Sequence, residues 1–562
     1  MSKTKRQIAL VCSMVLLGSV AAQAASVSPM TQQEQLEQAR LADEARSERL
    51  QRPGRVEIEG IPALETAMPP APGGPSFYIR QIRLEGMEPE FLFLYEKVAD
   101  YEHREMNLAT INEVARSLNQ MLLDRGYATS RVIIPEQKLE HGMLSLVVQP
   151  GRIHKFIYSK DSYDITWRTA FPCREGDILN VRQLEQGIEQ MQGVSSQTVS
   201  MRLLPAAKAG MSDIELTVTR TKPFHGLLSV DDSGLSSTGR LQLNANIAID
   251  SPFYANDLLQ VGFNGDGAMD GYERGTRSQS IYYRIPYGRE SFSISYYRYK
   301  YHQTVHSIPY DFISGGETDV TTLTWEHLMS RDQRSKASFD VSLRKRNSHN
   351  FINDVEIPIQ TLHTTALEVG ISKVLYGQNY TVYGRVGHRM GLGWFGAMPE
   401  NDYADGPKTR YHMWLFDFDY QRPFTMGHRP AIYTASFHGQ WTMAGDKLYG
   451  VDMISMGNRY TVRGFDGEYT LMSESGWYLR NELASSVPKL HSDIYIGIDV
   501  GKVYGPSTED LVGKNIAGAV LGMRGSFSSG LSYDVFAGLP IYKPDGYHTE
   551  HVTSGFTFSW RF

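Results

Sequence analysis

LQLNANIAID, at residues 241–250, alternates apolar and polar side chains at almost every step. The same alternation returns in WLFDFDY, residues 414–420, with aromatic side chains on the apolar face. Because successive residues of a strand point to opposite faces, each stretch has one apolar and one polar face. A strand that separates lipid from a polar lumen needs this pattern over about ten residues. The two stretches therefore predict membrane-spanning β-strands.

Residues 224–562 are predicted to consist of such strands. This segment lacks a helical period, and sixteen candidate strands are separated by turns and polar loops. Short turns on one side and long loops on the other are typical of outer-membrane barrels. We expect a mainly β fold, a 16-stranded antiparallel transmembrane β-barrel. A soluble β-sandwich or a secreted repeat protein is the alternative, and both fit sixteen segments with alternating loop lengths poorly. The short connections lie at residues 251–257, 286–290, 331–334, 488–492 and 526–530, and the long ones near 302–318, 345–363, 391–409 and 443–475.

Residues 1–24 have the pattern of a secretory signal peptide. Three cations precede an apolar run at residues 8–20, and Ala22-Gln23-Ala24 supplies small residues for cleavage. The apolar run is shorter than the roughly 20 residues of a membrane-spanning helix. We expect an exported chain that starts near Ala25 and, given the barrel, lies in the outer membrane of a Gram-negative bacterium.

Charge and cysteine content exclude several kinds of partner and cofactor. The 56 Lys and Arg residues fall to 53 once the signal is removed, while 62 Asp and Glu remain, so the mature chain is acidic and a poor ligand for nucleic acid. Cys12 lies in the signal, and Cys173 alone cannot form a disulfide framework. The sequence has neither a metal-ligand spacing nor a phosphate-binding loop, and we expect no metal and no cofactor.

Residues 25–52 are predicted to contain a helix without an apolar face. Thr31 and Glu34 stand at capping-box spacing, and a helix over Thr31–Arg52 is polar nearly all round. At 1.5 Å per residue it spans roughly 33 Å, near a membrane thickness, so a polar tube would suit it. Residues 53–75 hold six prolines and predict a semi-extended linker. The helix before this linker is therefore expected to be tethered to the following domains rather than packed against them.

Two small α+β domains are predicted between the linker and the barrel, at residues 76–151 and 152–223. Each reads as a strand, an amphipathic helix ended by glycine, and two further strands. The strands are expected at 77–84, 130–134 and 143–148 and then at 153–158, 198–204 and 213–219; the apolar faces of the helices are Leu108, Ile111, Val114, Ala115, Leu118 and Leu122, and Val181, Leu184, Ile188 and Met191.

The stretch RYTVRGFDGE, residues 459–468, lies in the sixth and longest outer loop of the predicted barrel. Two strands later, in IYIGIDVG, isoleucines share one face, so Asp499 points into the lumen. By the same rule Arg480 and Glu482 of the strand between face the lumen. A loop folded inward would give Arg463 a carboxylate partner. From the residues alone, a solvated surface arginine is the other interpretation.

These motifs together resemble a known family. The VRGF motif, Val462 to Phe465, the pair Asp499 and Gly501, the terminal Phe562 and two preceding α+β domains are similar to the outer-membrane transporters of two-partner secretion. These are the haemolysin and filamentous-haemagglutinin transporters of the POTRA-plus-barrel superfamily. The family usually has an aromatic residue two positions before the aspartate, where this chain has Gly497.

The resemblance implies a division of labour. The two POTRA domains would bind the N-terminal secretion domain of a large exoprotein in the periplasm, and the barrel would translocate it unfolded. The N-terminal helix, with Thr31, Glu34 and Arg52, would plug the barrel, and Arg463 of loop six would pair with Asp499. Gly464 would allow close approach and Phe465 would form the loop tip. Further expected partners are outer-membrane lipid, lipopolysaccharide and the barrel-assembly machinery; the chain is expected to be monomeric, and its cargo to be an adhesin, a cytolysin or a contact-dependent growth-inhibition toxin.

Three other functions compete with this one. An insertase for other barrel proteins belongs to the same superfamily, but usually carries more periplasmic domains. A barrel enzyme is disfavoured, because the neighbours His491, Ser492 and Asp493 point alternately to opposite faces of a strand and do not form a triad. A simple porin or receptor does not account for two periplasmic domains. We expect a transporter without catalytic residues.

Overall fold

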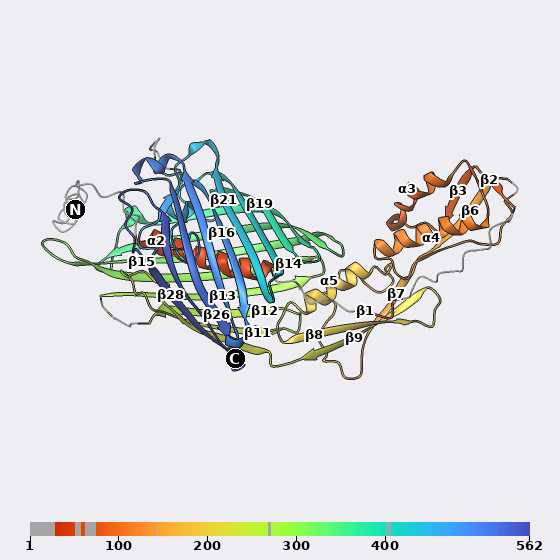
Figure 1. Ribbon diagram of the computed structural model, residues 1–562, viewed down its shortest axis with the longest axis horizontal. Helices are drawn as coiled ribbons and strands as arrows, with labels where there is room; N and C mark the ends of the chain where they lie inside the picture. The colour runs from red at the N-terminus through yellow and green to blue at the C-terminus, as the bar shows by residue number, and fades with distance from the viewer. Residues whose placement is uncertain are drawn as a thin grey trace.

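A computed structural model describes residues 29–50, 58–61, 75–139, 141–267, 271, 273–400, 403 and 406–562. The predicted signal peptide, Arg52 and most of the predicted linker lie outside the described residues. Figure 1 shows a barrel at one end of the molecule, a helix inside it, and the small N-terminal domains extending from the other end.

The described strands form a closed antiparallel barrel of sixteen, which confirms the predicted fold class. Each strand pairs with its neighbour in the sequence, and a two-residue strand, β17 (Val355–Glu356), extends one outer loop. The barrel strands are β10 (Phe224–Asp231), β11 (Gln242–Asp250), β12 (Leu258–Asp266), β13 (Arg274–Tyr287), β14 (Glu290–Val305), β15 (Phe312–Arg331), β16 (Ser335–Ile352), β18 (Leu362–Tyr376), β19 (Thr381–Leu392), β20 (His412–Met426), β21 (Arg429–Thr442), β24 (Ser475–Val487), β25 (Ser492–Tyr504), β26 (Asn515–Ser526), β27 (Leu531–Tyr542) and β28 (Thr553–Arg561).

The alternation seen in the sequence separates the two faces of the barrel wall. Ile247 of β11 and Trp414 of β20 are exposed on the outside, and so is Ile496 of β25, at 54%. Asp499, three residues further along β25, is 0% exposed on the lumen side. Because this period of two holds along the strands, the apolar face of the barrel meets lipid and the polar face surrounds the lumen.

Two of the predicted long loops are largely strand. β14 continues to Val305 and β15 begins at Phe312, so the loop expected near 302–318 is a short tip; likewise β16 continues to Ile352 within the loop expected at 345–363. Backbone hydrogen bonds between neighbouring strands do not depend on side-chain polarity. The strands therefore remain paired beyond the point at which the apolar alternation in their sequence stops.

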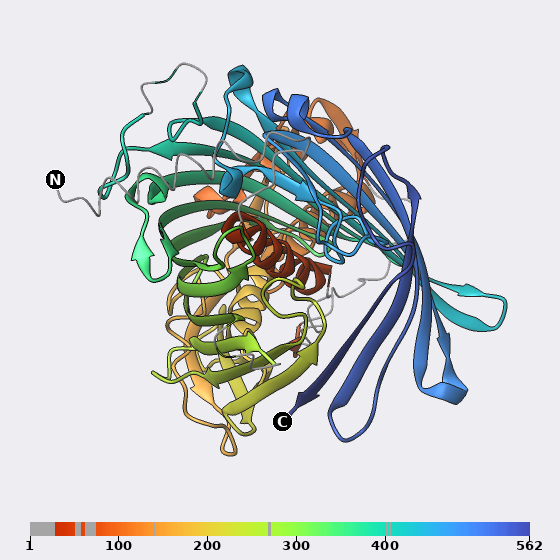
Figure 2. The same cartoon turned by 90° about the vertical axis from the view of Figure 1, so that its left-hand side faces the viewer.

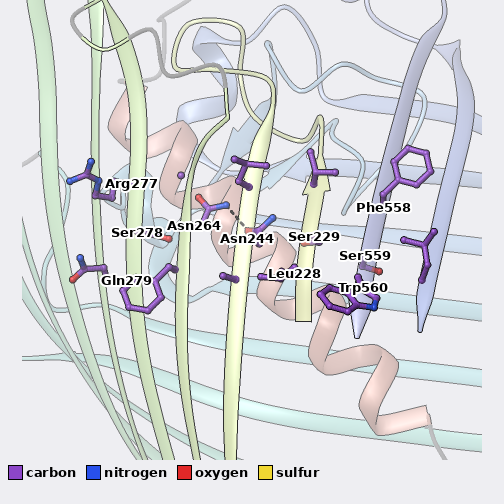
Figure 3. Close-up of a pocket in the computed structure, with 16 residues that line it drawn as sticks. Leu228, Ser229, Asn244, Asn264, Arg277, Ser278, Gln279, Phe558, Ser559 and Trp560 are labelled. Carbon is purple, nitrogen blue, oxygen red and sulfur yellow. Dashed lines mark hydrogen bonds between the residues drawn. The ribbon is translucent and has the colours of Figure 1, made fainter. Parts of the chain in front are cut away.

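The barrel closes between its first and last strands. β10 pairs with β28 from Leu227 opposite Arg561 to Asp231 opposite Thr557. A groove of about 730 Å³ lies over this seam on the outer wall, and α2 lies behind the seam strands in Figure 3. Exposed apolar side chains such as Leu228 and Trp560 line it, so the groove belongs to the lipid-facing surface.

The two small domains have the predicted α+β composition. In the first, the strand expected at 77–84 is broken at Arg80 into two strands that join different sheets, and Leu108, expected in the core, is exposed at the first position of its helix. The first domain contains β2 (Phe77–Ile79), β3 (Gln81–Glu85), α3 (Leu94–Val98), β4 (Arg104–Met106), α4 (Leu108–Asp124), β5 (Arg131–Ile133) and β6 (Met143–Gln149); the second contains β7 (Arg152–Tyr158), α5 (Val181–Met191), β8 (Gln197–Pro205) and β9 (Met211–Arg220).

The linker includes a strand that the proline content did not predict. β1 (Ile58–Glu59) pairs in parallel with Met201 and Arg202 of β8, and it adds a fourth strand to the sheet of the second domain. Ile58 packs against the core of that domain. A short part of the linker is therefore paired, because Ile58, an apolar residue between the prolines, packs against this domain.

The second domain is docked on the periplasmic end of the barrel through polar contacts. The backbone N–H of Gly288, in the turn between β13 and β14, donates to the carbonyl of Thr169 at 2.8 Å. Glu189 of α5 pairs with Arg331 at 2.6 Å and with Lys336, both at the turn between β15 and β16. Burial raises the pKa of Glu189, but these two cations outweigh it and hold the pKa below its usual value.

Helix α2 (Pro29–Leu50) lies inside the barrel, as the view along the barrel shows (Figure 2). It begins two residues before Thr31, so the predicted capping box is wrong: Thr31 lies inside the first turn, and Glu34 is turned to the barrel wall. Proline is favoured at the start of a helix, and Pro29 is in the first turn. No helix within the described ranges is long and apolar enough to cross a membrane.

Candidate functional site: the inward loop and the lumen helix

Loop six, residues 443–474, folds back into the barrel. Its two arms pair as β22 (Ile454–Met456) with β23 (Leu471–Ser473), and the residues between them reach the lumen side of β24 and β25. This ribbon places the VRGF motif beside the strands that carry Asp499 and Arg480. The loop is an aperiodic stretch in the sequence because its position is set by contacts with the wall rather than by a local repeat.

Arg463 is the centre of a buried ion cluster. Its Nε donates to Oδ2 of Asp499 at 2.7 Å, and its Nη2 donates to Oδ1 at 3.0 Å. The backbone N–H of Arg463 donates to the same carboxylate at 3.0 Å, and Nη1 pairs with Glu482. Planar two-point contact between guanidinium and carboxylate is among the stronger polar interactions in proteins. The structure thus brings Arg463, Asp499 and Glu482 together.

Two glycines allow the arginine and its loop to approach the wall. Gly464 has φ of +96°, and a Cβ there would lie 2.5 Å from the carbonyl oxygen of Leu539. A Cβ at Gly497 would lie 2.5 Å from Nη2 of Arg463. A side chain at position 497 would therefore meet the guanidinium of Arg463 in its present position.

The neighbours of Arg463 pack in an apolar cluster rather than at an exposed tip. Val462 and Phe465 are buried with Met456, Leu471 and further residues of the barrel wall. The ring of Phe465 meets Tyr547 of the eighth outer loop edge to face, with centroids 5.4 Å apart. Gly501 lies under this cluster, where a Cβ would come within 2.5 Å of the sulfur of Met456. Ion cluster and apolar cluster together fix loop six.

Arg480 connects the lumen helix to loop six. Its Nη1 donates to Asp43 of α2 at 2.6 Å and to the carbonyl of Tyr460 in loop six at 2.7 Å. Glu482, two residues along the same strand, pairs with Arg463 and with Arg524 of β26 at 2.8 Å. Both residues thus face the lumen, and Arg480 contacts the two inward elements at once.

Further polar contacts hold α2 along its length. The amide of Gln32 donates to the carbonyls of Gly467 and Glu468, and that of Gln35 to Gly450 and Met453, all in loop six and all at 2.7 to 2.8 Å. Near the other end of the helix, Arg49 pairs with Asp419 of β20 at 3.2 Å. The helix therefore rests on loop six at its N-terminal half and on the barrel wall at its C-terminal half.

Sequence reasoning missed a second buried ion cluster. Arg346 of β16 is 2.7 Å from Glu34 of α2 and 3.3 Å from Asp452 of loop six. Strand parity would have placed Arg346 in the lumen, because Leu343 of the same strand faces outward. Its two partners had no such signal, since a helix without an apolar face gives no preferred direction to Glu34.

The described residues contain no group of three or more His, Cys, Asp or Glu that would hold a metal ion. Cys173 is buried in the core of the second small domain, and burial raises the pKa of its thiol to about 12. The thiol therefore stays protonated and unreactive at neutral pH. Ser492, in the sequence His491-Ser492-Asp493, donates to the carbonyl of Leu490 and contacts the hydroxyl of Tyr533, each at 2.6 Å.

Comparisons with known proteins agree with this architecture. A POTRA domain of the ShlB type matches residues 77–151, and a second POTRA domain matches residues 152–205. The fold and these matches define a barrel protein preceded by two POTRA domains. The haemolysin secretion/activation protein family ShlB/FhaC/HecB matches residues 210–525, and the chain belongs to this family. The resemblance inferred from VRGF and Asp499 is confirmed at the level of the family.

Relatives match over nearly the whole chain. The outer membrane transporter CdiB-2 of Burkholderia pseudomallei is 37% identical over 476 residues, which cover 84% of this chain and 81% of the relative. The outer membrane transporter CdiB of Dickeya dadantii is 30% identical over 566 residues, 98% of each chain. The solved structure of CdiB from Escherichia coli has a TM-score of 0.85 at 25% identity and covers 96% of this chain and 100% of that one.

Proposed function

We propose that this chain is an outer-membrane transporter that recognises a large exoprotein in the periplasm and carries it unfolded to the cell surface. The observation that supports this most is that two elements inside the barrel, α2 and loop six, fill the lumen that the strands enclose. Relatives named outer membrane transporter CdiB and hemolysin transporter ShlB point to the same activity.

The direction of the strands gives the orientation in the membrane. The POTRA domains precede β10 and contact the short turns, so they lie in the periplasm and the long loops lie outside. We propose that the protein is a monomer inserted by the barrel-assembly machinery and surrounded by lipid and lipopolysaccharide. We propose that the exported partner is an adhesin, a cytolysin or a growth-inhibition toxin.

We propose that α2 is a plug whose hydrogen bonds to loop six can be replaced by hydrogen bonds to water. Its contacts with loop six are side-chain amides on backbone carbonyls, and each such bond contributes only about 1 kcal/mol because water offers the same partners. We propose that α2, through Thr31, Glu34 and the region up to Arg52, closes the resting pore against leakage. Deletion of residues 29–50 should raise single-channel conductance sharply in planar bilayers.

The cluster of Arg463, Asp499 and Glu482 is proposed as the anchor that keeps loop six in the lumen during transport, with Gly464, Phe465 and Gly501 shaping its seat. The family is one of transporters, and we propose no catalytic role for any residue. Since the sequence contains no nucleotide-binding motif, folding of the cargo outside the cell is proposed to drive net transport.

The test is secretion of a co-expressed partner exoprotein, with Arg463→Ala and Asp499→Ala as variants and barrel insertion measured in parallel by heat-modifiable gel mobility. Secretion should fall at least tenfold while insertion is retained. Arg240→Ala is the control, because Arg240 pairs with Glu550 on the exposed surface. Normal secretion by both lumen variants would remove the anchor from the proposal.

The alternative within the superfamily is an insertase for other barrel proteins. The relatives are named transporters, and they favour export of a partner. Depletion of this chain separates the two functions: loss of one exoprotein from the surface supports transport, and a general loss of outer-membrane barrels supports insertion.

A further inference from the structure

Four cations lie on the outer wall of the barrel, toward the outer ends of strands β13 to β16. We call them the outer-wall patch: Arg277 of β13, Arg298 and Lys300 of β14, and Lys345 of β16. Each is an even number of residues away from an outward-facing apolar residue of its own strand, as Lys300 is from the exposed Ile294. Because side chains alternate along a strand, all four point away from the lumen.

The outer-wall patch begins directly above an apolar groove on the same four strands. The groove has a volume of about 510 Å³, and Phe292, Ile294 and Leu343 are among the residues that line it. Lys345 is two residues beyond Leu343 on an outward-running strand, which is about 7 Å. A cation on the lipid face costs about 2–4 kcal/mol at the membrane midplane and little near the interface. The patch therefore lies where the apolar interior of the membrane ends.

Two cations of the patch are paired with carboxylates of β15. Nζ of Lys300 is 2.7 Å from Glu317, and Arg298 pairs with the same Glu317 and lies 3.7 Å from Asp319. These carboxylates lie on the outer face as well, opposite the two cations in the register. Two of the four positive charges are thus compensated within the wall, and both side chains are held in place.

The other two cations have no such compensation. Arg277 has Gly265 of β12 and Lys300 of β14 as its neighbours across the strands, and both neighbours of Lys345, on β15 and β18, are threonines. Among the residues that the structure describes, neither Arg277 nor Lys345 has an ion-pair partner. The patch therefore carries an excess of two positive charges, on a chain whose Asp and Glu outnumber its Lys and Arg.

The chemistry of the patch and the groove defines the kind of ligand that fits. A guanidinium binds two phosphate oxygens at once, and an ammonium binds phosphate as a point charge. The groove below offers an apolar surface to acyl chains. Patch and groove extend over four strands, about 14 Å across. This width suits a lipid with several acyl chains and two phosphates better than a two-chain phospholipid.

We propose that the outer-wall patch and the groove below it are a binding site for lipid A, the bisphosphorylated and multiply acylated anchor of lipopolysaccharide. Arg277 and Lys345 bind its phosphates, while Glu317 holds Lys300 and Arg298 at the wall beside them. The acyl chains lie in the groove. This inference rests on the proposed orientation in the membrane and is independent of transport.

The experiment counts lipids on the purified protein in detergent. Native mass spectrometry during a titration with bisphosphorylated lipid A should show one bound molecule on the unmodified chain. The triple variant Arg277→Gln, Lys300→Gln and Lys345→Gln should bind it roughly tenfold more weakly, a loss of about 1.4 kcal/mol. Heat-modifiable gel mobility verifies that the variant barrel is folded. Undiminished binding by the folded variant would overturn the site.

A second triple variant removes the same amount of charge elsewhere. Lys373→Gln, Arg422→Gln and Lys489→Gln change exposed cations at the periplasmic end of the barrel. Binding of lipid A should stay within about twofold of the unmodified chain, because these cations are remote from the groove. A loss as large as that of the first variant would mean that net charge, and not the patch, attracts the lipid.

A comparison of lipids on the unmodified chain needs no variant at all. Lipid A without its two phosphates and the two-chain lipid phosphatidylglycerol should each bind roughly tenfold more weakly than bisphosphorylated lipid A. Equal binding of the dephosphorylated form would overturn the role of the cations, and equal binding of phosphatidylglycerol would overturn the assignment to lipid A. These measurements contain no exported partner, so failure of the lipid site leaves the proposed transport intact, and failure of transport leaves the site intact.

Discussion

Loop six and helix α2 both fill the lumen, but they are held in opposite ways. Loop six is fixed by one dense cluster, in which Arg463 and Asp499 are shut away from water and Val462 and Phe465 are buried beside them. Helix α2 is fixed by contacts spread along its length, from Gln32 to Arg49; one of them, Glu34 with Arg346, is a buried ion pair, and most others are single polar bonds to the loop or wall.

This difference indicates that loop six is a permanent part of the folded barrel and that helix α2 is the easier of the two to remove. Removal of one partner from a buried ion pair costs about 3–5 kcal/mol, because the other charge is left buried without compensation. Each buried apolar side chain contributes a further 1.5–3 kcal/mol or so. The amide contacts of α2 contribute only about 1 kcal/mol each, and Glu34 with Arg346 is the one contact of the helix described above to which the buried-pair cost applies. Loop six is therefore expected to unfold only with the barrel, whereas α2 leaves at the cost of one buried ion pair and several weak bonds.

The strongest test of this contrast is Arg463→Ala. The change leaves Asp499 buried without its cation and leaves Glu482 with Arg524 alone, and the free energy of unfolding of the barrel should fall by about 3–5 kcal/mol. Urea unfolding of the purified protein in detergent, followed by heat-modifiable mobility, measures it. Arg240→Ala should change stability by less than about 1 kcal/mol. Equal losses in the two variants would mean that loop six is no more integral than the surface.

A smaller effect is expected from Gly464→Ala. The residue has φ of +96° and its new Cβ would meet the carbonyl of Leu539, so both backbone strain and crowding oppose the change, at about 2 kcal/mol. Gly396→Ala is the matched control: its φ is +78°, but a Cβ there meets no atom within 4 Å. The same unfolding measurement should show a smaller loss, about 1 kcal/mol, for the control. If the two losses are equal, crowding against the wall does not contribute.

Arg480→Gln tests the point where the two elements meet. The variant loses the contacts with Asp43 of α2 and Tyr460 of loop six together, so we expect conductance of the closed pore to rise while barrel stability falls by about 1–3 kcal/mol. Arg49→Gln removes the contacts with Asp419 and with the ring of Tyr383, neither of which involves loop six, and should raise conductance less. Planar-bilayer recordings rank the two, and a larger effect at Arg49 would contradict the bridging role of Arg480.

The smallest effect concerns the charged contact outside the lumen, where water reaches the groups. The pKa of Glu189 is lowered in the docked domain from its ordinary 4.5, because the attraction of Lys336 and Arg331 exceeds the effect of burial. Its contribution to docking is therefore present above pH 4.5 and lost as the pH falls through the lowered pKa. Spin-label distances between α5 and the barrel should widen in acid, and Glu189→Gln should remove this pH dependence. A response unaltered by Glu189→Gln would assign it to another group.

Strand parity made much of the site accessible from the sequence. The isoleucines of β25 fixed the direction of Asp499, and Arg480 and Glu482 followed from the same rule on β24. The pairing of Arg463 with Asp499 needed more, since strand parity left a solvated arginine as the other interpretation and the resemblance to a transporter family favoured the pair. The capping box at Thr31 and Glu34 failed because the helix already includes Pro29, so Thr31 lies inside it, and the carboxylate of Glu34 pairs with Arg346.

The sequence by itself determined the barrel, its number of strands, the two small domains and the inward face of each strand, because these depend on local periods of 2 and 3.6 residues that repeat over many positions. The tertiary structure alone decided where aperiodic segments go. The path of loop six, the contacts of a helix without an apolar face and the seat of β1 on β8 all arise from partners outside the local segment, such as Asp499, 36 residues beyond Arg463, and no local period encodes such a contact.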